Sequence, residues 1–496
     1  MRLLLCTVPV VLLLAATSMR RAEAHAFGQR YDLPLPLDLY LAAAGAAVAV
    51  SFLIIALFSA RLGTRTFRTR LVLWQRPDES ASWRILGHVL RAVGVAIFFL
   101  IISAGLVGAA SPVKNIAPLL VWVLWWVGFL LFTALIGNLW PALDPWASLR
   151  NLALRGRDAR PRLAWPAWLG GWPAVLLFLA FGWAELIGPF GESPSDLALL
   201  VLAYSLLAWG GMMLFGDAAW HNNADPFRRV FGLIGAFSLF FRTQREADRP
   251  LVLRLPGSGL LEAGTGRISD VVFVMAVLAT VTFDGFSETP LWAAFLDWIA
   301  RSQMLRPVLL GISSFGIGIL DAIRTTALIV APLVAVAIYT LFCALTSLAD
   351  RAVTLGMVMR AFAVSLLPIA IAYHLSHYIS YLLLAGQFAI PMASDPFGFG
   401  WDLFGTSRYV MDIGIIGARQ VWYVAVAALV TGHIISVIVA HSIALRLFPS
   451  ARAATLSQLP FLVLMVGFTA CSLWILAQPV VNEPAIGNPP AASSAP

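Results

Sequence analysis

The sequence has little charge and very little cysteine. Only 12% of its 496 residues are charged, whereas 60% are hydrophobic. Soluble proteins usually carry about 25% charged residues, so this composition argues against a soluble globular protein. The three cysteines, Cys6, Cys343 and Cys471, lie in apolar stretches and form no CxxC pair. We therefore expect neither a disulfide framework nor a thiolate metal site.

Several motifs of nucleotide- and metal-dependent enzymes are also missing from the sequence. It contains no GxxxxGK[ST] loop, no GxGxxG and no HExxH, which argues against an ATPase, a dinucleotide enzyme and a zincin. The net charge of +8 comes almost entirely from arginine in short segments between apolar runs. That pattern is typical of cytoplasmic loops rather than of a nucleic-acid-binding surface, so we expect no nucleic-acid partner.

Long apolar runs dominate what is present. A membrane-spanning helix needs about 20 apolar residues, and about ten such runs follow the first two dozen residues. They lie near residues 36–60, 87–110, 118–137, 167–190, 196–216, 268–286, 326–349, 361–385, 419–444 and 459–478. These runs predict an all-α, polytopic transmembrane helix bundle over residues 25–480, in contact with the lipid bilayer.

Residues 1–24 are typical of a cleavable signal peptide. Arg2 precedes an apolar stretch from Leu3 to Ala16, and Ala22-Glu23-Ala24 matches an A-x-A cleavage site. Arg20-Arg21, just before that site, leaves an uncleaved anchor as the alternative. Cleavage places the mature N-terminus outside the cell.

Arginine sets the expected orientation of the bundle. Arginine clusters follow the first, third, fifth and ninth runs, and all of them fall on the cytoplasmic side if the mature N-terminus is external. Residues 481–496 then form an external tail, predicted to be disordered. The longest cytoplasmic loop, 217–267, contains FRRVFGLIGAFSLFFR, which is typical of an interfacial helix. The glycine-rich segment 304–326 fits this orientation as a re-entrant or surface-lying piece and is a candidate pocket wall.

Three Asp-Pro-aromatic tripeptides begin at Asp144, Asp225 and Asp395. An aspartate N-cap followed by proline at the first helical position is a usual helix start, so each tripeptide predicts one. His88 and His221 lie in or next to predicted cytoplasmic segments, and we interpret both as structural or interfacial.

The stretch AYHLSHYISY, residues 372–381, raises the question of chemistry. His374 and His377 are three residues apart and share a helix face, and the next apolar run adds His433 and His441. Ionisable residues within a membrane usually face the bundle interior and mark a site, although histidine can also simply join helices by hydrogen bonds. Imidazole suits metals such as zinc and copper. The tyrosines of the stretch are interpreted as hydrogen-bonding neighbours and interface anchors.

Carboxylates near the predicted external surface can complete such a site. Asp284 and Glu288, in VTFDGFSETPLW, end the sixth run, and each is a candidate ligand or general base. A carboxylate with two or three histidines is a common hydrolytic metal set; the alternative is a capped helix end with a solvated loop. Asp297 and Glu185 are weaker candidates. His25, the first mature residue after cleavage, can chelate copper with the terminal amine, or it follows the cleavage site by coincidence.

Several longer segments resemble a known family. They are HAFGQRYDLPLPLDLYLAAAG, GNLWPALDPW, VTFDGFSETPLW, AYHLSHYISYLLLAGQ, SDPFGFGWDLFGT and ALVTGHIISVIVAHSIAL. Together, from about residue 25 to about residue 445, they resemble a family of bacterial polytopic membrane proteins named after membrane-bound fenitrothion hydrolase. The resemblance implies a bacterial inner-membrane location, and the arginine pattern then places both termini of the mature chain in the periplasm.

The resemblance also implies organophosphorus hydrolysis. Water would attack the phosphorus of a hydrophobic triester such as fenitrothion, taken from the membrane, and release a nitrophenol and a dialkyl thiophosphate. The leading hypothesis is a metal-assisted hydrolase with His374, His377 and His433 as ligands of a zinc or copper ion. Asp284 is the next candidate, followed by Glu288 and His441. One alternative is a copper-handling or transport protein with an intramembrane histidine path. Another is a structural protein whose histidines only join helices.

Overall fold

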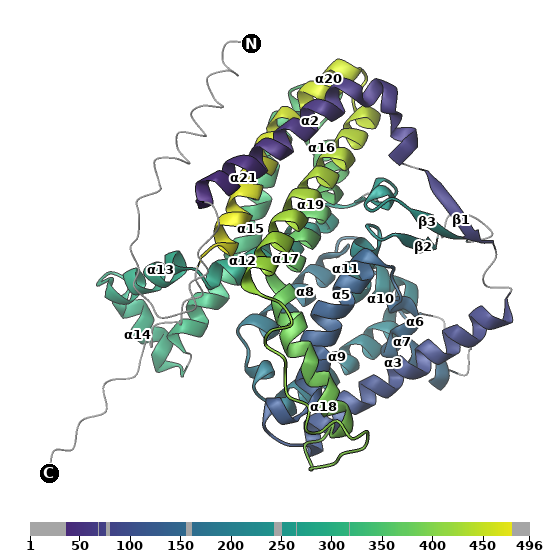
Figure 1. Cartoon of the computed structure of the whole chain (residues 1–496), viewed down its shortest axis with the longest axis vertical. Coiled ribbons are helices and arrows are strands. Elements are labelled where there is room, and N and C mark those ends of the chain that lie inside the picture. Colours follow the sequence, from purple (N-terminus) through teal and green to yellow (C-terminus); the bar gives the residue numbers. More distant parts are fainter. Residues whose placement is uncertain are drawn as a thin grey trace. The chain divides into compact units, whose positions relative to one another are not determined.

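The computed structural model describes residues 36–67, 69–75, 80–154, 161–242, 250–263, 265–316 and 318–478 (Figure 1). The predicted signal peptide, His25 and the predicted C-terminal tail lie outside the described residues. Everything below concerns the described part of the chain.

In these ranges, nine helical segments are long and apolar enough to cross a membrane. They are α2 (Leu37–Phe67), α3 (Ala81–Val107), α4–η3–α5 (Ile116–Leu135), α9 (Pro194–Phe215), α12 (Ile268–Ser287), α15 (Ile319–Ser347), α16–α18 (Leu355–Ser394), α19 (Ala418–Leu447) and α20–α21 (Ala451–Leu476). The predicted run at 167–190 corresponds to a shorter apolar helix, α8 (Trp172–Leu186). The prediction of a polytopic transmembrane helix bundle is confirmed.

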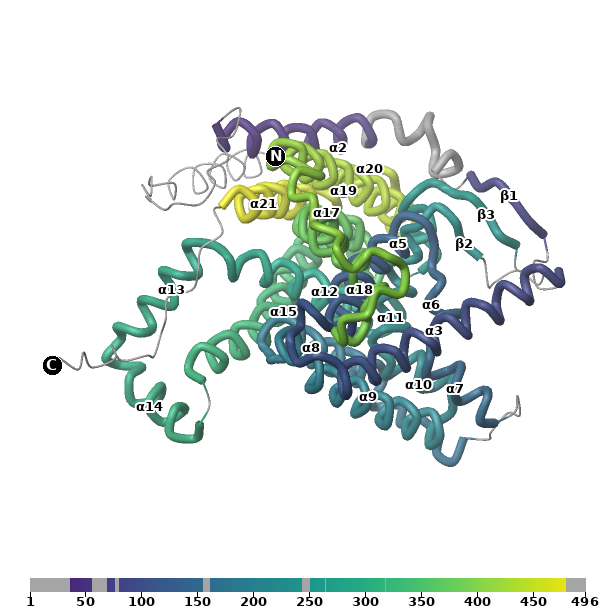
Figure 2. Tube along the Cα trace, turned by 60° about the horizontal axis from the view of Figure 1, so that its bottom comes forward, coloured from purple at the N-terminus to yellow at the C-terminus, as the bar shows by residue number. Residues whose placement is uncertain are grey.

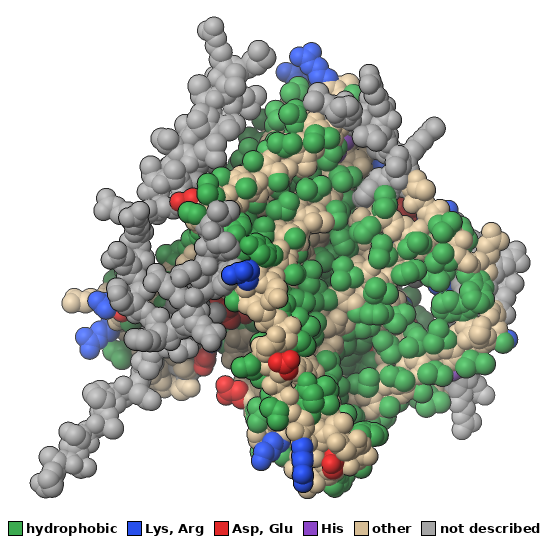
Figure 3. All heavy atoms as spheres, in the orientation of Figure 1, with side chains coloured by type: hydrophobic (Ala, Val, Ile, Leu, Met, Phe, Trp, Pro, Cys, Tyr) green, Lys and Arg blue, Asp and Glu red, His purple; other side chains and the backbone are tan. Residues whose placement is uncertain are grey.

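The surfaces of these helices suit lipid rather than water. On α3, the side chains of Ile85, Phe99 and Val107 are 63%, 54% and 63% exposed. Figure 3 shows hydrophobic side chains across most of the described surface that faces the viewer. Continuous apolar surface of this kind is costly in water and favourable in a bilayer. The chain is therefore a multi-pass membrane protein in contact with lipid.

The polar candidates sit on the most buried helices. Phe273, Met275 and Ala276 of α12 are almost completely buried, and α12 contacts α8, α15 and α17 (Leu367–Ala385). The helix α17 also packs along α19, and the two run side by side in both views (Figure 1; Figure 2). A helix that is buried around most of its circumference must place any polar side chain inside the protein. The fold thus points Asp284 and the α17 histidines inward.

The third span contains a π-helix, η3 (Leu119–Phe129), between α4 (Ile116–Pro118) and α5 (Leu130–Leu135). Its Trp122 and Trp126 are buried, and η3 contacts α17. Stretches of π-helix often occur at functional sites because the wider turn redirects side chains. Here the wider turn brings buried indoles next to the histidine-bearing helix.

The loop predicted at 217–267 contains more secondary structure than the single interfacial helix expected from the sequence. It folds into α10 (Asp217–Asn223), α11 (Pro226–Gly235), β2 (Phe240–Arg242), β3 (Leu251–Arg254) and the short helix η5 (Ser258–Leu261). The strand β3 pairs antiparallel with both β2 and β1 (Arg70–Trp74) in a small sheet that the sequence analysis did not predict.

The apolar face of α11 is buried in protein. Phe227, Val230 and Phe231 are at most 5% exposed, and the ring of Phe231 lies 5.2 Å from that of Trp140, which begins α6 (Trp140–Leu143). An amphipathic pattern marks a helix with one apolar face, but it does not say whether lipid or protein covers that face. Here aromatic side chains of the bundle cover it.

The segment 304–326 is not a single re-entrant piece. It divides into α14 (Arg306–Ser314) and the first turns of α15, and Gly316 between them has a φ of +76°. That left-handed conformation is easy only for glycine and ends the first helix. No residue of α14 is buried, and α14 supplies none of the cavity wall described below. It follows α13 (Pro290–Arg301), whose Trp292 and Leu296 are buried.

Two of the three predicted aspartate N-caps are confirmed. Asp144 Oδ1 accepts a hydrogen bond from the Ala147 amide at the start of α7 (Pro145–Ala153). Asp225 Oδ1 accepts from two amides at the start of α11. The third prediction is wrong, because Asp395 follows α18 (Ala389–Ser394), and its carboxylate closes a loop by accepting from Phe399 and Gly400.

Candidate functional site

A carboxylate and an imidazole meet between α12 and α17. Asp284 Oδ2 lies 2.9 Å from His377 Nε2, and the Tyr378 hydroxyl donates a hydrogen bond to the same oxygen. The side chains of His377 and Asp284 are only 11% and 18% exposed. An ionised carboxylate only accepts hydrogen bonds, so Nε2 of His377 carries a hydrogen. When the ring is neutral, Nδ1 is then the basic nitrogen.

A glycine next to the aspartate allows this contact. A Cβ atom on Gly285 would lie 2.1 Å from the Tyr373 hydroxyl oxygen, well inside van der Waals contact. Glycine therefore lets the two helices approach at the level of Asp284 and His377. The sequence analysis named Asp284 and His377 separately, and the structure brings them into direct contact.

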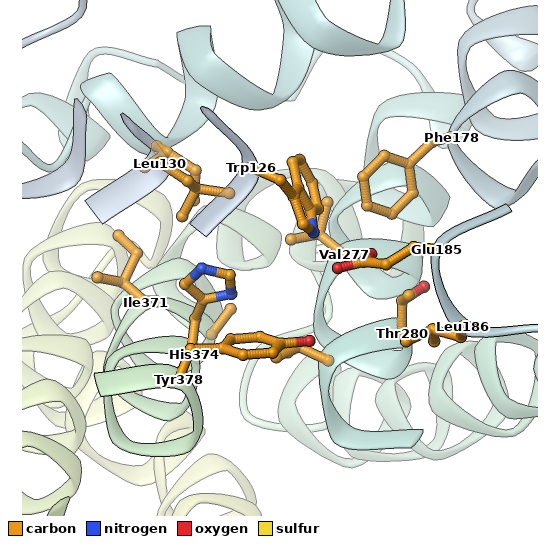
Figure 4. A pocket seen from close by; sticks show the side chains of 13 residues that line it. Trp126, Leu130, Phe178, Glu185, Leu186, Val277, Thr280, Ile371, His374 and Tyr378 are labelled. Carbon is orange, nitrogen blue, oxygen red and sulfur yellow. The ribbon is translucent and has the colours of Figure 1, made fainter. Parts of the chain in front are cut away.

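A cavity lies on the Tyr378 side of this pair, with a lining of aromatic, aliphatic and a few polar side chains that does not include Asp284 or His377. Its lining includes Trp126, Phe178, Glu185, Thr280, His374 and Tyr378. Figure 4 shows His374 and Tyr378 on one side, facing Glu185 and Thr280 on the other, with the Trp126 indole nitrogen directed toward the Glu185 carboxylate. The cavity is small, about 30 Å³, so a ligand larger than water would need the surrounding side chains to move apart.

Two polar atoms in this wall are buried without a hydrogen-bond partner among the described residues. They are Nε2 of His374 and Oγ1 of Thr280. Unpaired buried polar atoms are costly, and a ligand or water in the cavity would satisfy them. Tyr378 connects the two features, because its ring lines the cavity while its hydroxyl bonds to Asp284. Its predicted role as a hydrogen-bonding neighbour is confirmed.

The remaining sequence candidates do not join the Asp284–His377 contact. Glu288 is the exposed C-cap of α12. On α19, Nδ1 of His433 bonds the Leu429 carbonyl oxygen at 2.7 Å, and Nδ1 of His441 lies 2.8 Å from Gln458 Nε2. Each of these histidines therefore has a local partner that orients its ring.

The intramembrane histidines do not form a metal-ligand set in the described part of the chain. No three of His374, His377, His433, His441, Asp284 and Glu288 bring their ligand atoms within 4.8 Å of one another. A metal with three protein ligands about 2.0–2.2 Å away needs its donors closer together than that. The group that does meet this distance is Asp144, His221 and Asp225.

Sequence reasoning missed this second group because each member had a sufficient structural explanation. Burial raises the pKa of the Asp144 and Asp225 carboxyls, and their mutual charge adds to the rise for Asp225. Burial, together with the positive charges of Arg228 and Arg150, lowers the pKa of His221 to about 4. The available signal was the i, i+4 spacing of His221 and Asp225 just before a proline-started helix.

Fold and cavity together define a polytopic membrane protein with a polar pair inside its helix bundle. Comparison with protein-family models, with curated proteins and with solved structures found no match to this chain.

Proposed function

We propose that this protein is a hydrolase of hydrophobic phosphotriesters in the bacterial inner membrane. It would cleave fenitrothion-like aryl phosphorothioates to a nitrophenol and a dialkyl thiophosphate. The observation that carries the proposal is the hydrogen-bonded Asp284–His377 pair beside an aromatic cavity within the bundle. The resemblance of the quoted motifs to the fenitrothion hydrolase family supplies the substrate class.

The paired residues suit general-base catalysis. Asp284 fixes the orientation and tautomer of His377, so that the other ring nitrogen is free to take a proton from water. The water oxygen then forms a bond to phosphorus, the bond from phosphorus to the aryl oxygen breaks, and the nitrophenolate leaves. The proton taken by His377 is released to solvent or to a product, so the reaction balances as the addition of one water.

The paired residues also suit the charge that develops during this step. As water adds, negative charge grows on the sulfur or oxygen attached to phosphorus. The imidazolium that forms on His377 would offset this charge, because opposite charges attract strongly in a water-poor site. The step as proposed is carried by side chains of the bundle, and the group in the described residues whose ligand atoms lie within 4.8 Å of one another, Asp144, His221 and Asp225, is elsewhere.

The surroundings suit a substrate that arrives from lipid. An aryl phosphorothioate partitions into a bilayer, and the aromatic side chains of Trp126 and Phe178 in the cavity wall favour an aryl group. The predicted orientation places α12's Asp284 end toward the periplasmic leaflet, because Arg267 precedes the other end of the helix.

The direct test is nitrophenol release from fenitrothion by membranes that contain the full-length protein. Asp284→Asn and His377→Gln should lower release by at least about 100-fold, while Asp297→Asn should retain it. Asp297 is a matched control because its carboxylate is exposed and pairs with Arg301 on the surface of α13. Full activity in correctly inserted Asp284→Asn protein would overturn the proposal.

A second candidate, metal transport along a histidine path, is favoured by one observation. Nε2 of His433 and of His441 is buried without a partner among the described residues. The two lie eight residues apart on α19, about 12 Å along the helix, which is too far for one ion but suits a relay. Metal-dependent flux in vesicles without nitrophenol release would favour this candidate.

A further inference from the structure

Two helix N-caps face one histidine at the arginine-rich end of the bundle. Asp144 caps α7 and Asp225 caps α11, and in both residues the amide hydrogen bonds are made by Oδ1. Capping therefore leaves the Oδ2 atom of each carboxylate for another partner. Both Oδ2 atoms are directed toward Nε2 of His221, at 3.7 Å from Asp144 and 3.9 Å from Asp225.

These distances are too long for hydrogen bonds, which end near 3.5 Å. They are close to the separation of two ligands on one ion, since donors 2.1 Å from a tetrahedral metal lie about 3.4 Å apart. Asp144 is 1% exposed, and its Oδ2 has no hydrogen-bond partner among the described residues. A buried, unpaired carboxylate oxygen aimed at a histidine is a costly arrangement that a cation would relieve.

We propose that Asp144, His221 and Asp225 bind a divalent transition-metal ion of the zinc type. The ligand atoms are the two Oδ2 atoms and Nε2 of His221, and water would complete a tetrahedral site. Imidazole with carboxylates suits zinc, whereas calcium and magnesium prefer oxygen ligands alone. This site is independent of the proposed hydrolase site.

The distance between the two sites supports that independence. Arg229 of α11 forms an ion pair with Asp270 at the start of α12, so the start of α12 lies on the side of the metal cluster. From Asp270 to Asp284 the helix rises by about 21 Å. The metal cluster and the Asp284–His377 pair therefore lie near opposite ends of α12.

An aromatic shell surrounds the cluster. The ring of Trp146 lies 4.8 Å from Tyr204 and stacks on Phe227 at 6.0 Å, and the Tyr204 hydroxyl is 3.4 Å from Asp225 Oδ1. Such a shell limits water access and holds the metal-binding side chains in place. The cluster is thus shaped before any ion binds.

Neighbouring positive charge gives both carboxylates a role in cation binding. Arg228 acts electrostatically on all three residues, and Arg150, which pairs with Asp217, also acts on His221. The positive ends of the α7 and α11 helix dipoles also point toward the cluster and oppose a cation. Two anionic ligands oppose these effects. Loss of either carboxylate charge should therefore weaken binding.

The bound ion would join three segments that are distant in sequence: the starts of α7 and α11 and the middle of α10. An ion that binds the folded state alone raises its stability. We therefore infer a structural metal that holds the cytoplasmic ends of the helices together, rather than a catalytic one.

The test uses the full-length protein, purified in detergent, stripped with a chelator and reloaded with Zn²⁺. Wild type should retain roughly one zinc per chain and unfold at a higher temperature with zinc than without it. Asp144→Asn and Asp225→Asn should each weaken zinc binding at least about tenfold and remove the temperature shift. Asparagine is as good an N-cap as aspartate, so these changes keep the helix starts intact.

Two further measurements secure the result. Asp395→Asn alters the third Asp-Pro-aromatic tripeptide, which lies outside the cluster, and should bind zinc as wild type does. Co²⁺ added to stripped wild type should give the intense visible absorption of a tetrahedral site, and His221→Gln should lose it. The proposal fails if wild type retains no zinc, or if the Asp144→Asn/Asp225→Asn double variant retains as much zinc as wild type.

Discussion

Asp284 and His377 hold α12 and α17 together through a carboxylate–imidazole contact of 2.9 Å, and Tyr378 donates to the same carboxylate oxygen. Three polar groups thus form one unit between two of the most buried helices. In so apolar a setting each hydrogen bond is strong, and each loss leaves a partner unsatisfied. The unit is therefore both the centre of the proposed chemistry and a constraint on helix packing.

The first prediction separates these two roles. Asp284→Asn keeps an acceptor for Nε2 of His377 but removes the charge that supports a protonated imidazole. We expect nitrophenol release to fall by about 10²- to 10⁴-fold, the usual contribution of general-base catalysis, with the protein still folded and inserted. Release rates in vesicles, normalised to folded protein, measure this. If Asp284→Asn and Asp297→Asn release nitrophenol at the same rate, the pair is only structural.

The second prediction concerns the glycine beside the pair. Gly285→Ala places a methyl group against the Tyr373 hydroxyl, and we expect a loss of about 1–3 kcal/mol in the free energy of unfolding. Tyr373→Phe should recover part of that loss, because the hydroxyl has no hydrogen-bond partner among the described residues and its removal makes room. Thermal unfolding of the two single variants and the double variant measures the coupling.

A matched control for Gly285 lies in α21 (Leu459–Leu476). A Cβ atom on Gly467 would meet nothing within 4 Å. Gly467→Ala should therefore stabilise by up to about 1 kcal/mol, because alanine favours helix over glycine. Equal destabilisation by both alanine substitutions would mean that close packing at Gly285 is not the cause.

The sequence was sufficient to predict the bundle, because a span is recognised by length and hydropathy alone. It also identified Asp284 and His377 as site candidates, since ionisable residues are rare in apolar helices. It did not reveal that they touch each other, nor that His433 stays apart, because contacts between helices depend on the rotation of each helix about its axis. That rotation depends on packing details, such as the close approach of the helices at Gly285, which hydrophobic periodicity does not predict.

The Asp144–His221–Asp225 cluster shows a different limit. Two of the three Asp-Pro-aromatic tripeptides were correctly interpreted as helix starts, and N-capping was a sufficient explanation for their aspartates. The capping explanation uses only one oxygen of each carboxylate. That the second oxygens converge on His221 depends on how α7, α10 and α11 pack, which is a property of the tertiary fold. In the same way, the sequence of α11 predicts a helix whose apolar face meets lipid. The tertiary fold shows that aromatic side chains cover that face instead.

The third prediction tests the loop that carries the small sheet. Arg254, at the end of β3, donates to the backbone carbonyls of Gly235, Ala236 and Ser238 and lies over the Phe241 ring. Burial lowers its pKa to about 10, so it stays charged at neutral pH.

Replacing Arg254 by methionine leaves those buried carbonyls without their donor. We expect Arg254→Met to lower the free energy of unfolding by about 2–4 kcal/mol. Arg301→Met should cost less than about 1 kcal/mol, because Arg301 forms an exposed ion pair. Chemical denaturation of the purified variants measures both changes in the free energy of unfolding. Equal losses would show that the Arg254 contacts contribute little.

The fourth prediction tests whether the cavity is where substrate binds. Thr280 projects from α12 into the cavity wall, whereas Thr282, on the same helix, is not among the lining residues. Thr280→Met fills part of the space without touching the Asp284–His377 pair, and Thr282→Met makes the same chemical change away from it. We expect Thr280→Met to lower kcat/KM at least about tenfold, chiefly through KM. The loss should be larger for diethyl than for dimethyl nitrophenyl triesters, since the larger ester needs more room. A Thr280→Met protein with wild-type kcat/KM for both esters would place substrate binding outside this cavity, whatever the role of His377.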